Sequence, residues 1–451
     1  MKIIIVGCGN VGSTLAEQLN REGHDITIIE SRADALETVT NSIDVMGVVG
    51  NGAVYQVQME AGVRDADLLI ATTDSDELNM LCCLIAKKAG NCHTIARIRD
   101  PQYSAEIGYL KEELNLSLCI NPELAAAEEI ARLLKVPSAI KVDTFAKGRI
   151  ELLKLLIPAG SVLDHMKVFE VNTRLKCQVL ICTVERGDQV IIPNGGFELL
   201  SGDRISFIAR TNAYSHFFEQ AGIVNNRVQS LMIVGGGRIS YYLAKLLKDT
   251  GIEIKIIDRR EERCEELARE LPHCMIIHGD GSDQQLLSEE GISKTEAFAA
   301  LTGADEENIM ISLYASRAGQ AKLITKVNRT TFENVIADLK LGSVIYPKVL
   351  TADRIQQYVL AMQNSMGSNI ETLYHIAGDR AEALEFHVDQ PSAVTGIPLG
   401  ELKLKDNLLV ASIARNGKLI TPGGRDTIEV DDSVIIVSSG NRLRDLKDIL
   451  R

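Results

Sequence analysis

The 451-residue sequence lacks tryptophan and is poor in aromatic residues, which make up 4% of the chain. Proteins that bind single-stranded nucleic acid stack its bases on aromatic side chains, so this composition counts against that class. Cations are also in the minority, with 48 Lys and Arg against 61 Asp and Glu and a net charge of −13. Because Lys and Arg drive binding to phosphate-rich surfaces, we expect neither nucleic acid nor an anionic lipid surface as the main partner.

The nine cysteines show no C-x-x-C spacing, and their number is odd. This pattern is typical of buried thiols in a reducing compartment rather than of a disulfide framework. The sequence also lacks an apolar run close to the roughly 20 residues that a membrane-spanning helix needs, and it opens directly on an apolar strand at 2–6. We therefore expect no signal peptide and no direct insertion into a membrane.

The sequence contains an internal repeat, whose two copies are about 229 residues apart. The repeat covers the whole chain and not only one motif, because matched residues occur along its full length: Gly7 with Gly235, Asn79 with Asn308, Pro193 with Pro422, and Asp203 with Asp432. A dehydrogenase normally joins one cofactor domain to a dissimilar substrate domain. The duplication leaves no dissimilar part for that role.

Each copy opens with alternating strands and helices. The first copy is predicted to form strand 2–6, helix 13–21, strand 25–29, helix 33–39, strands 45–49 and 68–71, helix 78–89 and strand 94–98, and the series recurs over 231–327. The strands are continuous apolar runs, as in a parallel sheet covered on both faces. We therefore predict two Rossmann-like, doubly wound parallel-sheet domains, spanning 1–121 and 229–346.

Each parallel-sheet domain is followed by a helix beginning near a proline, 122–134 and 347–362, which suits a crossover or a dimer-forming arm. Short β segments then take over in 139–222 and 370–451, and we predict a small α+β lobe in each. Both lobes contain a predicted hairpin. Its turns are Arg186-Gly187-Asp188 and Arg415-Asn416-Gly417.

The first copy contains a G-x-G-x-x-G loop between its first strand and first helix, which raises the value of an otherwise weak motif. The candidate binding residues of this loop are Gly7, Cys8, Gly9, Asn10, Val11 and Gly12. The glycines would permit a tight turn, close approach of a pyrophosphate and close helix packing, and the helix N-terminus favours an anion. Glu30 ends the second strand, where it is placed to accept hydrogen bonds from ribose hydroxyls.

The second copy keeps this arrangement with changes. Its candidate residues are Gly235, Gly237, Arg238, Ile239 and the acid Asp258. Ser240 replaces the third glycine, so the sequence leaves open how closely the helix approaches and whether this loop binds. The two acids favour an unphosphorylated ribose, hence NAD(H) or an adenine nucleotide over NADP. Arg259 and Arg260 weaken that inference for the second site.

Three further pairs of segments repeat at the strand ends. Gly50-Asn51-Gly52 matches Gly279-Asp280-Gly281, where an adenine or ribose edge could lie. A T-x-x-D-E-x-N segment follows the fourth strand in each copy, beginning at Thr73-Asp74 and at Thr302. It is typical of a helix N-cap with acids in the first turn, and it also places these residues beside the ligand crevice. Arg97 and Lys326 end the fifth strands, either reaching a terminal phosphate or forming solvated strand-end charges.

Catalytic motifs are missing. The sequence contains no H-E-x-x-H, G-x-S-x-G or G-x-x-x-x-G-K-[ST] pattern, and none of its eight histidines recurs at an equivalent position in the other copy. Hydride transfer usually requires a general acid or base near the reacting carbon. We expect no enzyme, no catalytic residue and no metal site.

The duplicated layout closely resembles the TrkA family, the cytosolic regulatory subunits of bacterial Trk potassium uptake, whose units are KTN/RCK domains. The resemblance covers essentially the whole chain. It rests on the duplication and on Val6–Gly12, Glu30, Gly50-Asn51-Gly52, the two T-x-x-D-E-x-N segments and Ala96-Arg97-Ile98-Arg99-Asp100-Pro101.

The resemblance implies a regulatory subunit in the cytoplasm, peripheral to the cytoplasmic face of the inner membrane. It implies a homotetrameric ring with eight nucleotide-binding domains beneath a membrane-embedded, TrkH-like potassium transporter subunit. NADH, NAD, ATP or ADP would bind the glycine loops and change the shape of the ring, gating potassium flux. Gly7, Gly9, Gly12 and Glu30 would hold the pyrophosphate and ribose, and Arg97 would contact a phosphate.

Two other classes stay open. An NAD-dependent oxidoreductase predicts nicotinamide turnover and a catalytic residue in lobe 139–222 that lobe 370–451 need not keep, and the near-equivalence of the lobes counts against it. A soluble nucleotide sensor acting on a soluble partner is not excluded by any residue.

Overall fold

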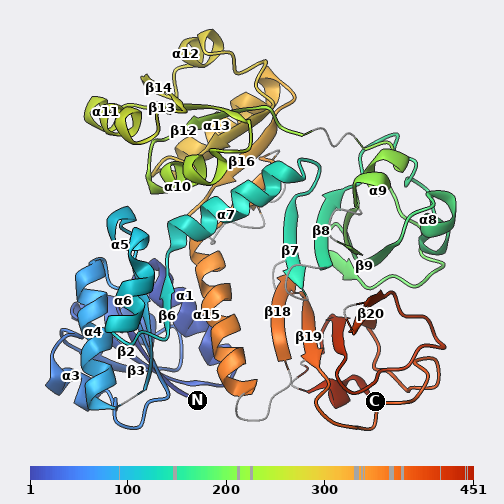
Figure 1. Cartoon of the computed structure of the whole chain (residues 1–451), viewed down its shortest axis with the longest axis horizontal. Coiled ribbons are helices and arrows are strands. Elements are labelled where there is room, and N and C mark those ends of the chain that lie inside the picture. The colour runs from blue at the N-terminus through green and yellow to red at the C-terminus, as the bar shows by residue number, and fades with distance from the viewer. Residues whose placement is uncertain are drawn as a thin grey trace. The chain divides into compact units, whose positions relative to one another are not determined.

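The computed structural model describes residues 1–90, 92–145, 150–210, 214–223, 227–329, 335–336, 339, 341–364, 370–376, 380–416, 418–441, 443 and 445–451. The chain divides into two compact units, each built from both copies. The first unit contains Met1–Ala131 and Gln229–Gln356, and the second contains Arg132–Val228 and Gln357–Arg451 (Figure 1).

The first unit contains two six-stranded parallel sheets with the same strand order. The first sheet, ordered β3-β2-β1-β4-β5-β6, is built from β1 (Lys2–Val6), β2 (Asp25–Glu30), β3 (Met46–Val49), β4 (Leu68–Ala71), β5 (His93–Arg97) and β6 (Leu118–Ile120). Its helices are α1 (Asn10–Arg21), α2 (Ala33–Thr40), α3 (Tyr55–Glu60), α4 (Asp76–Ala89), α5 (Pro101–Ala105) and α6 (Ile107–Glu113). The order reverses between β1 and β4, which creates the crevice where such folds bind ligands.

The second sheet, ordered β14-β13-β12-β15-β16-β17, repeats the first. Its strands are β12 (Ser230–Val234), β13 (Glu253–Asp258), β14 (Met275–His278), β15 (Ala297–Ala300), β16 (Lys322–Lys326) and β17 (Ser343–Ile345). The helices are α10 (Arg238–Leu247), α11 (Glu261–Glu270), α12 (Gln284–Glu289) and α13 (Asp305–Ala318). The predicted pair of Rossmann-like sheets is therefore confirmed.

Several element ends differ from the sequence prediction for local reasons. Helix α1 begins at Asn10 and not at Ser13, because the carbonyl of Gly9 already accepts a hydrogen bond from the Ser13 N–H at 2.9 Å. Helix α4 begins at Asp76 and not at Leu78, because the Ser75 hydroxyl accepts from the Leu78 N–H at 3.1 Å and caps it. The sixth strands were not predicted, since each has only three residues.

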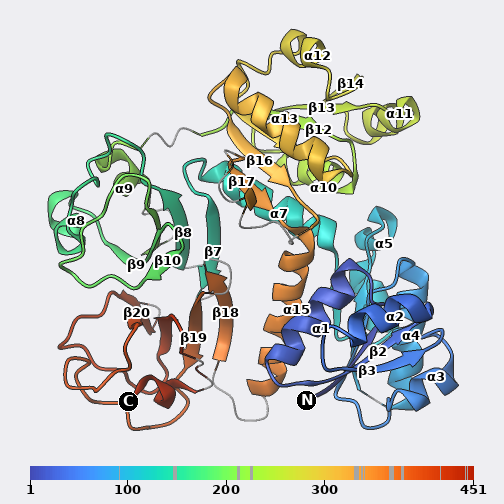
Figure 2. The same ribbon diagram turned by 180° about the vertical axis from the view of Figure 1, so that it is seen from behind.

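Two long helices leave the parallel sheets, α7 (Pro122–Lys135) and α15 (Pro347–Asn364), close to their predicted bounds. Both views show α15 beside α1 of the first copy (Figure 1, Figure 2). The Gln356 side chain accepts a hydrogen bond from Gln18 on α1 at 2.6 Å, and Arg354 forms an ion pair with Glu128 on α7. The helix that ends the second parallel-sheet domain therefore packs on the first one.

The second unit contains two five-stranded antiparallel sheets. The first, ordered β10-β9-β11-β8-β7, uses β7 (Lys141–Phe145), β8 (Ile150–Leu156), β9 (Val179–Arg186), β10 (Gln189–Ile191) and β11 (Arg204–Arg210), with helices α8 (Val168–Arg174) and α9 (Tyr214–Gln220). The second, ordered β18-β19-β22-β20-β21, uses β18 (Ile370–Ile376), β19 (Ala381–His387), β20 (Leu408–Arg415), β21 (Lys418–Ile420) and β22 (Ser433–Ser438), with a 3₁₀ helix at Leu446–Ile449. The two lobes share one apolar core, in which the Phe145 and Tyr374 rings meet edge to face at 4.8 Å.

The predicted hairpins are β9–β10 and β20–β21, both antiparallel. Gly187 and Asn416 occupy the left-handed backbone region that these turns require, with φ of 57° and 49°. Gly417, the last residue of the second predicted turn, lies outside the described residues.

One buried ion pair recurs in both lobes and fixes the turn before the last strand. Asp203 is 1% exposed and accepts two hydrogen bonds from Arg186, at 2.8 and 2.7 Å, and one from the Leu200 N–H. Asp432, fully buried, accepts from Arg415 at 2.8 Å twice and from the Glu429 N–H at 2.7 Å. A buried carboxylate with all its partners in place is costly to disturb.

Replacing Asp432 by Asn should lower the local free energy of opening of the second lobe by about 2–4 kcal/mol, because Arg415 loses its anion and a turn N–H loses a charged acceptor. Hydrogen exchange of the β20 and β22 amides measures this. The matched control is Asp431→Asn, at an exposed position with φ of 69° that asparagine tolerates. Equal exchange rates in the two variants would contradict a structural role for the ion pair.

Candidate functional site

The first glycine loop is held by the neighbouring strand β2 and packs tightly against the first turn of α1. Gly7 has φ of 92°, and its N–H donates to the carbonyl of Ile29 on β2 at 2.8 Å. A Cβ on Gly12 would lie 1.9 Å from the Gly7 carbonyl oxygen. A side chain at Gly12 would therefore push the first turn of α1 away from the sheet.

The N-terminus of α1 is left open at Gly9. A Cβ there would meet no atom within 4 Å, the N-cap has no side-chain hydrogen bond, and the first turn contains no acid. The first N–H groups of a helix have no partner within the helix, and the helix dipole adds partial positive charge. Asn10 is exposed and Val11 is buried. The loop therefore has the form of an anion cradle.

Glu30 lies directly beside this loop. One carboxylate oxygen accepts from the Cys8 N–H at 2.9 Å, and the other accepts from the Arg32 N–H and the Ser31 hydroxyl, both at 3.1 Å. Burial raises the pKa of Glu30, but the N–H groups of Cys8 and Arg32 lower it more, so the net pKa is below its ordinary value. The carboxylate is ionised and holds the loop. Burial and the contact with Glu30 raise the pKa of the Cys8 thiol to about 11, so the thiol is not reactive.

The second loop solves the same packing problem with different atoms. Gly235 has φ of 102°, and its N–H donates to the Ile257 carbonyl at 2.8 Å. Ser240 is fully buried, and its hydroxyl donates to the Gly235 carbonyl. The close approach that the sequence left open is therefore retained through a hydrogen bond. Gly237 is the open N-cap of α10, and a Cβ added there would meet no atom within 4 Å.

Asp258 differs from Glu30 in having a cation folded onto it. It accepts from the Gly236 N–H at 2.7 Å and from the Arg260 N–H at 2.9 Å, and the Arg260 guanidinium lies 3.2 Å from it. Burial raises the pKa of Asp258, but the Arg260 side chain and the two N–H groups lower it below its ordinary value. Of the two arginines that follow Asp258 in the sequence, Arg260 therefore forms an ion pair with this acid.

The loops after β3 and β14 pack against the central strands. A Cβ on Gly52 would lie 2.2 Å from a Val6 methyl group, and one on Gly281 would lie 2.1 Å from Val234. Between the glycines, Asn51 accepts from the Ala53 N–H at 2.9 Å, and Asp280 accepts from the Ser282 N–H at 2.8 Å. These glycines bring both loops to the crevice edge of their sheets.

The T-x-x-D-E-x-N segment is a clamp between two strand ends. Asn79 is fully buried, accepts from the Thr73 N–H at 2.8 Å and donates to the Arg97 carbonyl at 2.9 Å. In the second copy Asn308 accepts from the Thr302 N–H at 2.8 Å and donates to the Lys326 carbonyl at 3.0 Å. One amide thereby fixes the loop after the fourth strand to the end of the fifth.

The acid of this segment has a second clamping role. Asp76 accepts from the N–H groups of Arg99 and Asp100 at 2.7 and 2.8 Å. Asp305 accepts in the same way from the N–H groups after β16. The N-cap prediction holds for Ser75, but Ala304 makes no side-chain cap. The acids therefore order the loop after the fifth strand, which the sequence did not indicate.

The cations that end the fifth strands are not solvated charges. Arg97 is 7% exposed and donates to the Thr73 carbonyl, and it lies 3.2 Å from Asp74. Lys326 is half-buried and donates to the Thr302 carbonyl at 2.9 Å. Burial lowers the pKa of both groups. The solvated alternative was wrong, because the clamp draws both side chains across the crevice.

Glu123, in the first turn of α7, was missed by the sequence reasoning. Its carboxylate partly offsets the effect of burial on the pKa of both Arg97 and Lys326, and one of its oxygens is buried without a hydrogen-bond partner among the described residues. Arg238 lies 4.0 Å from Asp100 of the first copy. The two crevices thus share charged neighbours. The signal available was Asn121-Pro122-Glu123 at a strand end, but nothing local shows that the second copy lies there.

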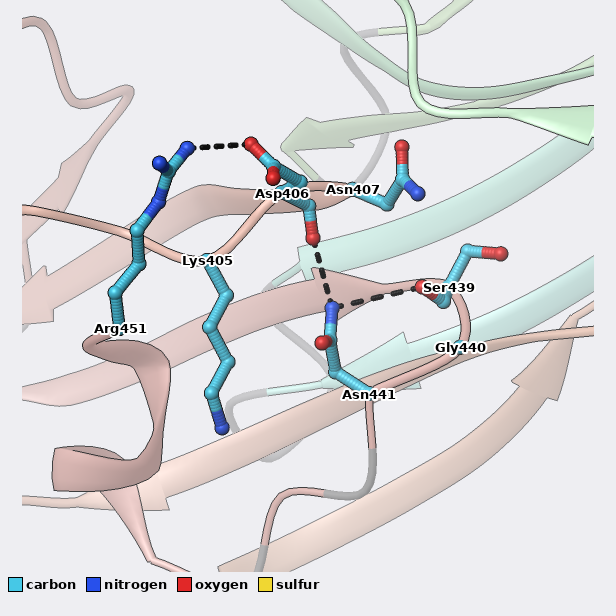
Figure 3. Close-up of a pocket in the computed structure, with 7 residues that line it drawn as sticks. All are labelled: Lys405, Asp406, Asn407, Ser439, Gly440, Asn441 and Arg451. Atoms are coloured by element: carbon cyan, nitrogen blue, oxygen red, sulfur yellow. Dashed lines mark hydrogen bonds and ion pairs between the residues drawn. The ribbon is translucent and has the colours of Figure 1, made fainter.

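A pocket of about 420 Å³ lies in the second lobe, at the ends of β20 and β22. Its lining residues are Lys405, Asp406, Asn407, Ser439, Gly440, Asn441 and Arg451. Figure 3 shows Arg451 turned toward Asp406 and Asn441 placed between Asp406 and Ser439, to which it donates at 2.8 and 3.5 Å. These polar groups largely satisfy one another, and the first lobe has Lys176, Cys177 and Gln178 at the matching positions. None of the residues that line this pocket is among the predicted site residues.

Within the described ranges, no group of three or more His, Cys, Asp or Glu is arranged to hold a metal ion. Nor does any helix in that part of the chain combine the length and apolarity needed to cross a membrane.

Comparison with known families covers both units. Residues 3–121 and 231–347 match the TrkA-N domain, and residues 152–222 and 383–451 match the TrkA-C domain. The chain belongs to the TrkA family. A Trk system potassium uptake protein TrkA homolog of Archaeoglobus fulgidus is 31% identical over 452 residues, covering 100% of both chains. TrkA of Vibrio alginolyticus is 32% identical over 448 residues, covering 97% of this chain and 95% of its own.

Solved structures agree with the TrkA-family fold. The GsuK RCK domain superposes with a TM-score of 0.62 at 16% identity, covering 97% of this chain and 92% of that one. The GsuK channel bound to NAD superposes with a TM-score of 0.61 at 16% identity, covering 97% of this chain and 77% of that one. The predicted family and the predicted pairing of Rossmann-like sheets with smaller lobes are both confirmed.

Replacing Gly12 by Ala should destabilise the first parallel-sheet domain by about 2–3 kcal/mol, because the added Cβ overlaps the Gly7 carbonyl. Calorimetry of the full chain measures the loss as a lower unfolding midpoint. Gly9→Ala is the matched control in the same loop, since its Cβ has open space and φ is already −66°. Equal midpoints for the two variants would show that close packing at Gly12 is unimportant.

Proposed function

We propose that this chain is a nucleotide-binding regulatory subunit of a potassium uptake system, and that it is not an enzyme. The observation that carries the proposal is the pair of open helix N-termini, at Gly9 and Gly237, each beside an ionised acid that holds the loop. Full-length similarity to relatives named as Trk system potassium uptake proteins supports the role. The four-domain division 1–121, 139–222, 229–346 and 370–451 is part of the proposal.

The proposed ligands are NAD(H) and the adenine nucleotides ATP and ADP. Their pyrophosphate would lie on the N–H groups at the starts of α1 and α10, with the ribose toward Glu30 or Asp258. Structures of the similarly folded GsuK are described as bound to NAD and to ADP, which supports this ligand class. The remaining binding contacts are assigned to Asn51, Thr73, Asp74 and Arg97 in the first site, and to Arg238, Ile239, Asp280, Thr302 and Lys326 in the second.

Gating would follow from differential binding and needs no chemical step. Arg97 is buried and Lys326 is half-buried, and the carboxylates of Asp74, Asp305 and Glu123 offset part of the effect of burial on their pKa values. A terminal phosphate brought to the crevice would compete with those carboxylates for the two cations. A nucleotide that binds one arrangement of the two domains more tightly shifts the equilibrium toward that arrangement. A difference of about 1.4 kcal/mol in binding free energy changes the ratio of the two arrangements tenfold. The proposed response therefore depends on how many phosphate charges the nucleotide brings to the crevice.

The proposed partner is a membrane-embedded, TrkH-like potassium transporter subunit. The proposed location is the cytoplasm, peripheral to the cytoplasmic face of the inner membrane through that subunit. The proposed assembly is a homotetrameric ring, in which nucleotide-driven changes in the ring would be passed to the transporter. Membership of the TrkA family supports each of these assignments.

Isothermal titration with NADH, NAD, ATP and ADP tests the binding sites. We expect two sites per chain, with Gly9→Asp removing the first and Gly237→Asp the second, each weakening its site at least about tenfold. Asp is a favourable N-cap residue, and a Cβ at either position has open space, so both variants should fold. Its carboxylate would occupy and repel the phosphate position.

The same proteins test gating. Added to vesicles that contain the transporter subunit, the chain should make potassium flux depend on nucleotide, and each Asp variant should reduce that dependence. Binding without any effect on flux would contradict the gating role. Steady NADH consumption with a metabolite would move the assignment to an oxidoreductase.

Self-assembly is supported by apolar side chains exposed at matching positions of the two copies. Leu81 on α4 is 45% exposed and Met310 on α13 is 66% exposed, 229 residues apart. Met46 and Met275, on the edge strands β3 and β14, form a second such pair at 68% and 59%. Repeated apolar positions are suited to contacts between copies in a ring.

We expect the wild-type chain to be a tetramer by sedimentation, and Leu81→Asp with Met310→Asp to give smaller species, because two charges would be buried at each contact. Met46→Asp with Met275→Asp tests the second pair in the same way, and a tetramer that survives both double variants would show that neither apolar pair lies at a contact between copies. A monomeric wild-type chain would overturn the ring.

A further inference from the structure

Tyr242 connects the second glycine loop to the first copy. It lies on α10, the helix whose N-terminus forms that loop, and is 7% exposed. Its hydroxyl donates to the Arg99 carbonyl at 2.9 Å and accepts from the Asn121 amide at 3.0 Å. Both partners belong to the first copy and lie in the same compact unit as Tyr242.

Both partners help to shape the first site. The N–H of Arg99 donates to Asp76 at 2.7 Å, and its guanidinium donates to the Asp74 carbonyl at 2.6 Å. Arg99 follows Arg97, the buried cation of the first crevice, by two residues. Asn121 accepts from the Leu124 N–H at 2.9 Å and so caps α7, the helix that carries Glu123. Movement of either partner would shift a charged group at the first crevice.

Arg238 lies one helical turn before Tyr242 and faces the same way, 4.0 Å from Asp100. Residues four apart share one face of a helix. Helix α10 therefore places its phosphate-loop end and a buried tyrosine against the segment that follows β5.

The residue equivalent to Tyr242 in the first copy makes a different contact. Thr14 holds that position in α1, 228 residues earlier, and its hydroxyl donates to the Asn10 carbonyl of its own helix at 2.9 Å. Among the contacts that the structure describes, Tyr242 therefore reaches the other copy, whereas Thr14 bonds within its own helix.

We propose that Tyr242 couples nucleotide binding at the second loop to the structure of the first site. The inference rests on the proposed function, in that it requires nucleotide binding at the second loop. Phosphate bound at the N-terminus of α10 positions that helix, and the Tyr242 hydroxyl passes the position to the Arg99 backbone and to the cap of α7. Tyr242 is a positioning residue and need not touch the nucleotide.

The test uses the full chain carrying Gly9→Asp, so that ADP binds only the second loop, as titration would show by a stoichiometry of one. Hydrogen exchange is then followed in residues 98–105 of the first copy, with and without ADP. We expect ADP to slow exchange there by roughly fivefold, in the usual range of coupling between sites.

Adding Tyr242→Phe should abolish that slowing while ADP still protects the second loop itself. The readout separates coupling from folding, because retained ADP affinity shows that α10 and its loop are intact. Tyr241→Phe is the matched control, since its ring is buried on the same helix and contacts Lys245 at 4.5 Å without a bond to the first copy among the described contacts. It should leave the coupling unchanged.

The outcomes are distinct. Slowed exchange that persists in Tyr242→Phe would overturn the role of Tyr242, as would ADP binding without any slowing in the chain that retains Tyr242. Equal loss in Tyr241→Phe would also overturn it, by assigning the effect to general loosening of α10. Failure of ADP to bind the Gly9→Asp chain would overturn the second binding site and the coupling together. If ADP then bound the first loop of the wild-type chain, the rest of the proposed function would stand.

Discussion

The contact between a loop carbonyl and the first turn of the following helix sets the geometry of both crevices. At Gly12 no Cβ fits against the Gly7 carbonyl, and at Ser240 a hydroxyl bonds to the Gly235 carbonyl. Either solution holds the helix N-terminus against the end of the central strand. Because the loop is held there, its unpaired N–H groups point into the crevice, and an acid at the end of β2 or β13 can reach the second loop residue.

Duplication kept this frame while the residues around it diverged. The clamping amides Asn79 and Asn308 make the same bonds, yet the cation they position is an arginine in one copy and a lysine in the other. A guanidinium can bind a phosphate through two parallel hydrogen bonds, whereas an ammonium acts as a point charge. The acids Glu30 and Asp258 also differ in their surroundings, since the Arg260 guanidinium lies 3.2 Å from Asp258. Two loops of one shape therefore have different charged groups around them.

Features that depend on neighbouring residues in the chain could be predicted from the sequence. Strand β4 was predicted with its bounds, because a continuous apolar run between turns is typical of a strand in a parallel sheet. The glycine loops were found because a tight turn requires glycine at Gly7 and Gly235. The position of Ser240 was visible, but not the bond by which it fits.

What the sequence could not show depends on contacts between distant segments. The sequence left Arg97 between a phosphate contact and a solvated charge. Its bond to the Thr73 carbonyl, 24 residues earlier, excludes the solvated charge, and the phosphate contact stays a prediction. Asp76 was assigned to the helix dipole, but its partners are N–H groups in the loop after β5. The contacts of Tyr242 could not be found from the sequence, since its partners lie more than 100 residues away. Periodicity and motif spacing contain no information about such pairs.

Charged groups connect the two crevices electrostatically. Burial makes a charged group costly unless an opposite charge is near, and here Glu123 acts on Arg97 and on Lys326 together. Asp74 acts on the pKa of Arg97, and Asp305 acts on the pKa of Lys326, in the same direction as Glu123 and more strongly. One oxygen of Glu123 has no hydrogen-bond partner among the described residues. Since the cations belong to different copies, one carboxylate of the first copy acts on both crevices, and the proposed gating would use this electrostatic link without a bond being broken.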